Sequence, residues 1–274
     1  MPFVITRGKL ALTAGVIPLV IVLYAARAVH ASAAPGVSAA KTSAPAQSPG
    51  AANEPERACS DNMARINDFC IDRYEAYVVE LATDGGERPH SPYLPVDGLT
   101  VRAKVAAGVV PQGYISQVQA AQACQNAGKR LCSADEFGLA CRGPEPSARY
   151  PYGGSSREPN WCNEGKGSAI PLVFGAAANY GPSQLNDARL NQLPSGLAKT
   201  GAHPRCVSPF GVYDLVGNLH EWGSDESDGH GRFRGGYFGD AELNGSGCAY
   251  VTRAHATGYH DYSTGFRCCS AARR

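Results

Sequence analysis

The segment from Asp214 to Glu221 contains residue types that could bind calcium. Asp214 and Glu221 supply carboxylates, and Gly217 between them breaks regular structure and turns backbone carbonyls inward. Hard oxygen ligands on a flexible loop suit Ca²⁺ better than a transition metal. The simpler alternative is a turn whose two carboxylates cap backbone N–H groups, and the spacing alone favours that turn.

Ten cysteines form the second set of chemically active residues, and all of them lie between Cys59 and Cys269. So many thiols indicate metal or redox chemistry in a cytosolic protein, but disulfides in an exported one. The sequence contains no CxxC motif, which argues against a redox-active pair. Ten cysteines also allow too many pairings for their spacing to fix the connectivity.

The N-terminus indicates export. Arg7 and Lys9 form a basic region, residues 10–26 carry no charge, and residues 31–33 (Ala-Ser-Ala) have the small-x-small pattern of a cleavage site. We therefore expect residues 1–33 to be a secretory signal peptide. The alternative is an uncleaved anchor, but residues 10–26 span about 25 Å where a hydrocarbon core needs about 30 Å. In both cases the rest of the chain is periplasmic or extracellular, and it contacts a membrane only if this segment stays uncleaved.

The rest of the chain divides into a tether and a domain. Residues 34–57 are rich in Ala, Pro, Ser and Gly and lack aromatic residues, so we expect a flexible linker. Residues 58–274 form the domain. Lys and Arg number 25 and Asp and Glu number 24, which gives a net charge of +1. This balance gives no reason to expect nucleic-acid binding. A 43% hydrophobic content excludes a wholly disordered chain, and 32 Gly and 19 Pro indicate a loop-rich fold.

Local signals predict the elements that must position these residues. Ser116 with Gln119 and Ser133 with Glu136 are capping boxes, which predict two helices. The expected helices cover residues 117–127 and 134–141. The expected strands cover residues 69–75, 77–79, 232–238 and 265–269.

Several segments, in order, resemble the formylglycine-generating enzyme, or sulfatase-modifying factor, family. They are FCIDRYE at 69–75, GKRLCSADEF at 128–137, YPYG at 150–153, SPFGVYDLVGNLHEW at 208–222, RFRGGYF at 232–238 and GFRC at 265–268. The resemblance covers essentially all of residues 58–274. It implies an α+β, C-type-lectin-like fold with much irregular structure, which agrees with the glycine content and the two capped helices.

The resemblance changes the interpretation of the first loop. In the family, the positions matching Asp214, Gly217, Leu219 and Glu221 bind calcium, the middle two through their carbonyls. We therefore expect calcium rather than a simple turn, with water or other residues completing the shell of six to eight ligands that Ca²⁺ takes. A second family calcium site has no clear counterpart, and Asn160 and Asn163 are its only candidates.

The sequence departs from the family where the enzyme chemistry should lie. Members that make formylglycine hold a copper ion with two cysteines downstream of the RGG motif, because soft thiolates suit Cu(I). The first of these positions is Asp240 here, and the nearest sulfur downstream is Cys248. We therefore expect no copper cofactor. The catalytic residues are unknown, and Cys248 and Asp240 are the remaining candidates.

The resemblance also suggests disulfides. Many exported members place one cysteine near position 248 and another in the Gly-Phe-Arg-Cys strand, so we expect Cys248 to bond Cys268 or Cys269. These neighbours face opposite sides of a strand, so only one is expected to reach. Cys59 and Cys70 are a second candidate pair at the domain entrance.

Two further segments could form an iron site or a phosphate site. His255, His260, Asp240 and Asp261 could form a nitrogen and oxygen site like the non-haem iron sites of sulfoxide-forming relatives. Those relatives take their histidines from a separate helical domain, and loop histidines are more often solvated, so we favour solvation. The Gly-rich run at residues 229–239 matches neither phosphate-binding pattern and is better explained by strands and loops.

Two functions follow from this sequence. The first is a binding module that lacks the copper chemistry and uses its loop-rich face to hold a peptide, a protein or a small molecule. The alternative is a divergent periplasmic oxidase that modifies a peptide or a small molecule. Loss of the copper cysteine pair favours the binding module.

Overall fold

The computed structural model describes residues 59–176 and 179–273. The expected signal peptide (1–33) and linker (34–57) lie outside these residues. Within the described part of the chain, no helix has both the length and the apolar character needed to cross a membrane.

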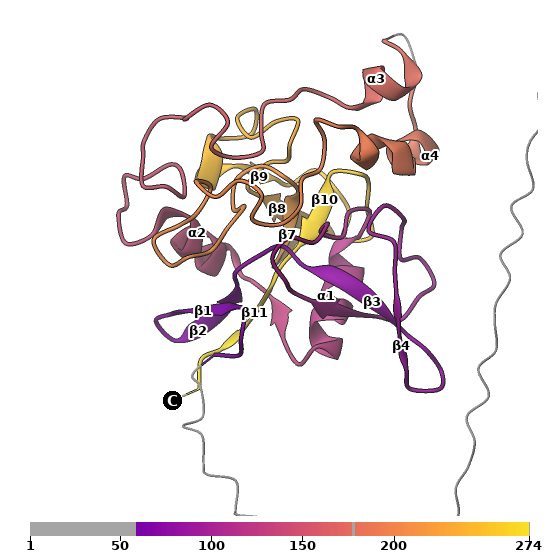
Figure 1. Cartoon of the computed structure of the whole chain (residues 1–274), viewed down its shortest axis with the longest axis horizontal. Helices are drawn as coiled ribbons and strands as arrows, with labels where there is room; N and C mark the ends of the chain where they lie inside the picture. Colours follow the sequence, from indigo (N-terminus) through magenta and orange to yellow (C-terminus); the bar gives the residue numbers. More distant parts are fainter. Residues whose placement is uncertain (1–58, 177–178, 274) are drawn as a thin grey trace, which may run out of the picture. The chain divides into compact units, whose positions relative to one another are not determined.

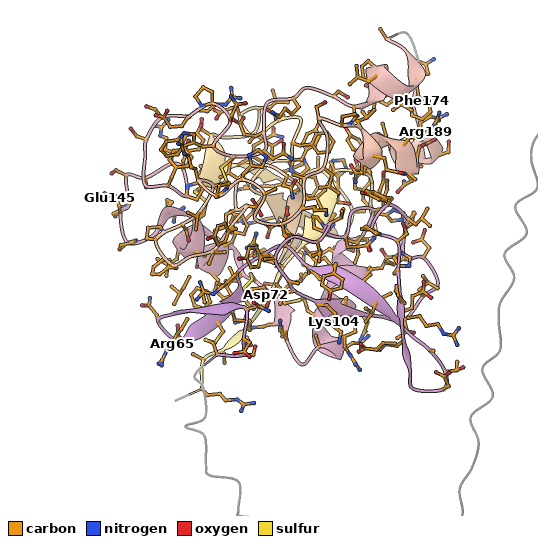
Figure 2. The ribbon with its side chains drawn as sticks, viewed as in Figure 1. Arg65, Asp72, Lys104, Glu145, Phe174 and Arg189 are labelled. Carbon is orange, nitrogen blue, oxygen red and sulfur yellow. A yellow bond between two sulfur atoms is a disulfide. The ribbon has the colours of Figure 1, made fainter. Side chains whose placement is uncertain are left out.

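The first sheet joins the two ends of the domain. Its strands follow the order β1-β2-β11-β6, and every neighbouring pair is antiparallel. They cover Met63–Ile66 (β1), Phe69–Asp72 (β2), Cys268–Ala271 (β11) and Arg130–Leu131 (β6). Figure 1 shows yellow β11 beside indigo β1 and β2. Asp72, central in Figure 2, accepts hydrogen bonds from Lys129 Nζ at 2.5 Å and from the Cys268 N–H at 3.2 Å, which ties three segments together.

Two further sheets complete the framework. One has the order β10-β7-β8-β9, with β10 parallel to β7. The other has the order β4-β3-β5 and is antiparallel. The strands cover Thr264–Phe266 (β10), His220–Ser227 (β7), His230–Arg234 (β8), Val251–Thr252 (β9), Glu87–Pro89 (β4), Tyr77–Leu81 (β3) and Val101–Lys104 (β5).

The two predicted helices are confirmed, with both capping boxes formed. Helix α1 covers Gln117–Asn126 and helix α2 covers Ala134–Arg142. In each, the N-terminal serine accepts from the N–H three residues later, and the Gln or Glu at that position accepts from the serine N–H. Four short helices follow: Ile170–Phe174 (α3), Pro182–Leu185 (α4), Ala188–Gln192 (η1) and Gly247–Ala249 (η2).

Three predicted strands are shorter than expected. The strand predicted at 69–75 ends at Asp72. The Arg73 N–H still bonds the Asn62 carbonyl in the same register, but Asn62 has a positive φ, so the pairing stops there. The strand predicted at 232–238 ends at Arg234, because Gly235 and Gly236 both take positive φ. The stretch predicted at 265–269 is split at Arg267 into β10 and β11, which belong to different sheets.

Five disulfides cross the domain and correct one sequence expectation. Cys59 is bonded to Cys70, as expected, but Cys248 is bonded to neither Cys268 nor Cys269. The other pairs are Cys124–Cys268, Cys132–Cys269, Cys141–Cys248 and Cys162–Cys206. Both cysteines of β11 find a partner because their side chains point to opposite faces of the strand. One face meets α1, and the other meets the segment before α2.

Candidate functional site

The loop after the RGG motif contains both catalytic candidates. A Cβ on Gly236 would collide with the backbone of Asp240 and Ala241, so the tight turn requires glycine there. Two backbone hydrogen bonds between Tyr237 and Asp240, of 2.8 and 3.0 Å, close the turn. The turn therefore fixes Asp240, the position at which the resemblance led us to expect a copper cysteine.

Asp240 and Cys248 both have structural partners. The Asp240 carboxylate accepts hydrogen bonds from the N–H groups of Glu242 (3.0 Å) and Leu243 (3.1 Å) and from the Tyr250 hydroxyl (3.1 Å). Cys248 is buried and bonded to Cys141 of α2, with the two Cα atoms 5.7 Å apart. Within the described residues no cysteine is free. A Cu(I) ion, which needs soft thiolates, does not fit this donor set.

A cavity of about 270 Å³ lies against the same loop, and six of its thirteen lining residues carry rings. The His220 ring centroid lies 4.5 Å from that of Phe233, 4.9 Å from that of Tyr237 and 5.3 Å from that of Tyr250. Burial, with a smaller contribution from His255, lowers the pKa of His220 to about 3. Its Nδ1 atom is buried and has no hydrogen-bond partner among the residues that the structure describes. This cavity was not predicted, because only tertiary packing collects its rings.

Asp261 supplies the buried carboxylate of this cavity. One oxygen accepts from the N–H and hydroxyl of Ser263 at 2.8 and 2.7 Å, and the other accepts from the Tyr259 hydroxyl at 2.6 Å. No Lys or Arg lies among the lining residues, and no ion pair to Asp261 occurs in the described part of the chain. The cavity is therefore aromatic and carries a net negative group.

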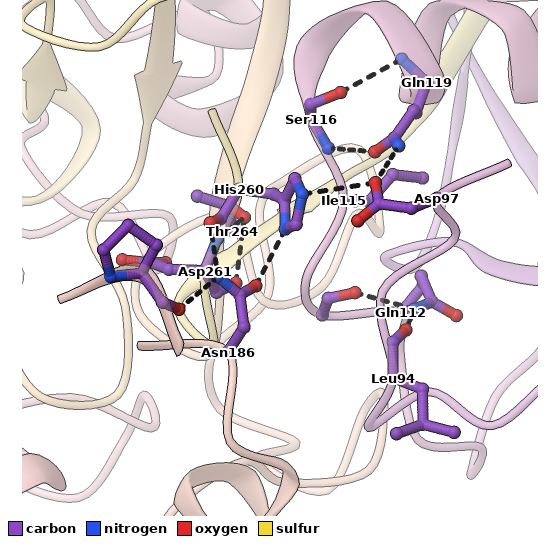
Figure 3. Close-up of polar contacts among 12 residues, drawn as sticks. Leu94, Asp97, Gln112, Ile115, Ser116, Gln119, Asn186, His260, Asp261 and Thr264 are labelled. Carbon is purple, nitrogen blue, oxygen red and sulfur yellow. Dashed lines mark hydrogen bonds and ion pairs between the residues drawn. The ribbon is translucent and has the colours of Figure 1, made fainter. Parts of the chain in front are cut away.

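Of the four alternative iron ligands, His255 and Asp261 line the same cavity, but His260 and Asp240 do not. The His255 ring stacks on Tyr259 at 4.0 Å, and burial lowers its pKa. The His260 ring instead lies between Asn186 (Nδ1 to Oδ1, 2.8 Å) and Asp97 (Nε2 to Oδ1, 3.3 Å), as Figure 3 shows. Across residues 59–176 and 179–273, no group of three or more His, Cys, Asp or Glu side chains is placed to hold a metal ion.

The predicted calcium loop is shaped by residues in the left-handed region of φ. Asp214, Gly217 and Asn218 have φ values of 57°, 78° and 59°. A Cβ on Gly217 would collide with the backbone carbonyl of Asn163, so only glycine fits there. The Asp214 carboxylate accepts from the Gly201 N–H at 2.7 Å. Of the second-site candidates, Asn163 donates from its amide to Asn218 Oδ1 and the Gly196 carbonyl, and Asn160 lies in an exposed turn.

Two residues that the sequence analysis did not select lie at this loop. Arg267 donates to both oxygens of Glu221, at 2.5 and 2.6 Å. Glu75 accepts from the Leu219 N–H at 3.0 Å and from the Asn218 amide at 2.5 Å. Both residues belong to motifs that carried the family resemblance, FCIDRYE and GFRC, and this is the signal that could have identified them.

The charges of this cluster do not balance. Three buried carboxylates, those of Glu75, Asp214 and Glu221, surround one buried guanidinium. Burial, reinforced by the charges of Asp214 and Glu221, raises the pKa of Glu75 well above its usual value. Burial also raises the pKa of Asp214 to about 6. Oxygen donors suit Ca²⁺. Burial favours the neutral form of Glu75 in the absence of an ion, and in the described part of the chain these three side chains are not already placed as a metal site. Each carboxylate offers about four lone-pair positions, so Glu221 can pair with Arg267 and still coordinate.

Comparison with known proteins adds the family. A model described as "Sulfatase-modifying factor enzyme 1-like domain" matches residues 42–272. No curated protein sequence matches the chain. Similar solved structures include PvdO from Pseudomonas aeruginosa, with 16% identity over 75% of this chain and 80% of that one and a TM-score of 0.45. The I1 variant of the Major Tropism Determinant has 14% identity over 79% and 54% of the two chains, with a TM-score of 0.45. Treponema denticola variable protein 1 has 14% identity over 80% of this chain and 93% of that one, with a TM-score of 0.48.

The expected α+β, C-type-lectin-like fold is confirmed by the family match and the mixed sheets and helices.

Proposed function

This chain belongs to the sulfatase-modifying factor enzyme 1-like family, and we propose that it is an exported member that works as a binding module without copper-dependent formylglycine synthesis. Five disulfides support export, because such bonds persist in oxidising compartments and are rare in the cytosol. The compartment we propose is the periplasm or the extracellular space.

One observation carries the loss of copper chemistry: the Cys141–Cys248 disulfide. The sulfur nearest to the RGG loop is consumed in that bond, and the first copper position holds Asp240, a hard oxygen donor engaged with backbone N–H groups. With no free cysteine in the described residues, the chain offers Cu(I) no thiolate. The copper chemistry of the family would therefore have no thiolate ligand here.

The binding role is supported by the cavity around His220. Ligand sites are typically concave and lined by apolar and aromatic side chains, with a few placed polar groups. The rings of Phe233, Tyr237 and Tyr250 and the buried polar groups of His220 and Asp261 meet this description. We propose that this cavity holds a small molecule or one side chain of a peptide or protein.

We also propose a structural calcium ion at the Asp214–Glu221 loop. The carboxylates of Asp214 and Glu221 and the carbonyls of Gly217 and Leu219 would hold it. When bound, the ion would supply positive charge to a cluster in which three carboxylates share one guanidinium. Its role would be to stabilise residues 214–221. His220 belongs to this loop and lines the cavity, so the ion would also stabilise the cavity wall.

Peptide mass spectrometry tests the loss of activity. A peptide containing the CxPxR sulfatase motif is incubated with the mature protein, O₂ and Cu(I), beside a Cys141→Ser/Cys248→Ser variant. We expect no formylglycine in either sample. Formylglycine formed by the wild-type protein and lost in the double variant would overturn the proposal, because Cys248 would then be a working copper ligand. The divergent-oxidase alternative would replace it.

A further inference from the structure

The imidazole of His220 has a hydrogen-bonding requirement that the described chain does not meet. The residue is 5% exposed, it lines the cavity, and its Nδ1 has no partner. Buried polar atoms in native proteins are almost always paired, and an unpaired one costs stability. A group that enters the cavity can supply the missing partner. We assign the proton to Nε2, which makes Nδ1 an acceptor, so the entering group must carry an N–H or O–H donor.

The charge of the cavity selects among such donors. The faces of aromatic rings are electronegative and attract cations, most strongly where water is excluded. Phe233, Tyr237, Tyr250 and Tyr262 present rings to the cavity, and Asp261 adds a buried carboxylate. No lining residue is a Lys or an Arg. An anionic ligand would meet the Asp261 carboxylate and no cationic side chain among the lining residues, whereas a cation would meet the aromatic side chains and the carboxylate.

The volume limits the size of the ligand. About 270 Å³ lies near the lower end of the range for small-molecule pockets, which is roughly 300–1,000 Å³. The cavity therefore accommodates a compact group with short alkyl substituents rather than a long or branched molecule.

We propose that this cavity binds a small protonated alkylamine. Its alkyl groups pack against the rings, its N–H donates to Nδ1 of His220, and the charge is balanced by Asp261. This inference rests on the proposed binding role and names the ligand class of that site. It needs no metal and no reaction.

Calorimetric titration of the mature protein with three probes of similar size tests the assignment. Trimethylammonium has an N–H and a charge, tetramethylammonium has a charge without an N–H, and tert-butanol has a hydroxyl without a charge. We expect trimethylammonium to bind at least tenfold more tightly than either of the others. Equal affinity for the two cations would overturn the role of His220, and binding of tert-butanol as tight as that of trimethylammonium would overturn the role of charge.

A matched pair of variants locates the site. His220→Phe keeps a ring in the stack but removes the acceptor, so it should abolish the preference for trimethylammonium over tetramethylammonium. Trp161→Leu removes a ring outside the cavity, which carries the Arg205 guanidinium 5.2 Å from its centroid, and should leave the affinity unchanged. An unchanged preference in His220→Phe would overturn the proposal, as would loss of binding in Trp161→Leu alone. If His220→Phe does not fold, the three-probe series on the wild-type protein decides.

The two proposals fail in different ways. Absence of binding by every amine overturns the ligand assignment and leaves the peptide assay, and with it the loss of copper chemistry, unaffected. Formylglycine formation overturns the proposed function even if amines bind.

Discussion

Arg267 donates two hydrogen bonds to the two carboxylate oxygens of Glu221, and these side chains are only 1% and 2% exposed. The pair joins β7 to the link between β10 and β11. Arg267 also donates to the carbonyls of Asp72 and Tyr213, so all of its hydrogen-bonding nitrogens have partners. The guanidinium thus places a positive charge among the buried carboxyl groups of Glu75, Asp214 and Glu221.

Removal of that charge should strongly destabilise the domain. We expect Arg267→Met to lower the free energy of unfolding by about 3–5 kcal/mol, because it leaves buried carboxylates without a counter-charge. The control is Arg189→Met, which breaks the exposed ion pair with Asp187 and should cost about 1 kcal/mol or less. Urea unfolding of the two variants measures the difference, and similar losses would contradict the buried-charge argument.

Calcium should raise the melting temperature if it binds at the Asp214–Glu221 loop. A ligand that binds only the native state stabilises it by about 2.7 kcal/mol at a hundredfold excess over its Kd. We expect Asp214→Ala to remove the difference between melting in calcium and melting in chelator. Asp84→Ala, an exposed acidic residue elsewhere, should retain it. Identical wild-type melting in the two conditions would show that the loop does not bind calcium.

The thiol count should be zero. All ten cysteines lie in the described residues and form five disulfides, so mature protein made in an oxidising compartment should not react with a thiol reagent under denaturing, non-reducing conditions. Reduction should release ten thiols. Six or more reactive thiols before reduction would contradict both the disulfides and the export proposal.

Gly217 should tolerate no side chain, whereas Gly153 should tolerate alanine at moderate cost. Both have positive φ (78° and 85°), which costs a non-glycine residue about 1–2 kcal/mol. At Gly153 a Cβ would meet nothing within 4 Å, so Gly153→Ala should lose only that amount. At Gly217 the Asn163 backbone would also have to move, so Gly217→Ala should lose clearly more, as measured by thermal melting. Equal losses would mean that the close approach to Asn163 has no energetic weight.

The sequence by itself determined the features that depend on near neighbours. The helices α1 and α2 were predicted to within one residue of their observed ends, because each capping box is formed by residues three positions apart. The motif order from residue 69 to residue 268 identified the family and the fold. The expectation that Asp240 stands where the family has a copper cysteine likewise rests on a single position and stays a prediction.

The tertiary structure alone decided which distant residues meet. Cys248 was expected to bond the C-terminal strand, but the order β1-β2-β11-β6 brings that strand to Cys124 and Cys132 and leaves Cys248 beside Cys141, which lies 107 residues earlier. In the same way Glu75 and Arg267 reach the Asp214–Glu221 loop, and Asp261 reaches the rings around His220. A disulfide requires Cα atoms about 4.4–6.8 Å apart, and a hydrogen bond requires about 3 Å. Separations this short between distant parts of a chain are set by sheet order and packing, which residue spacing does not encode.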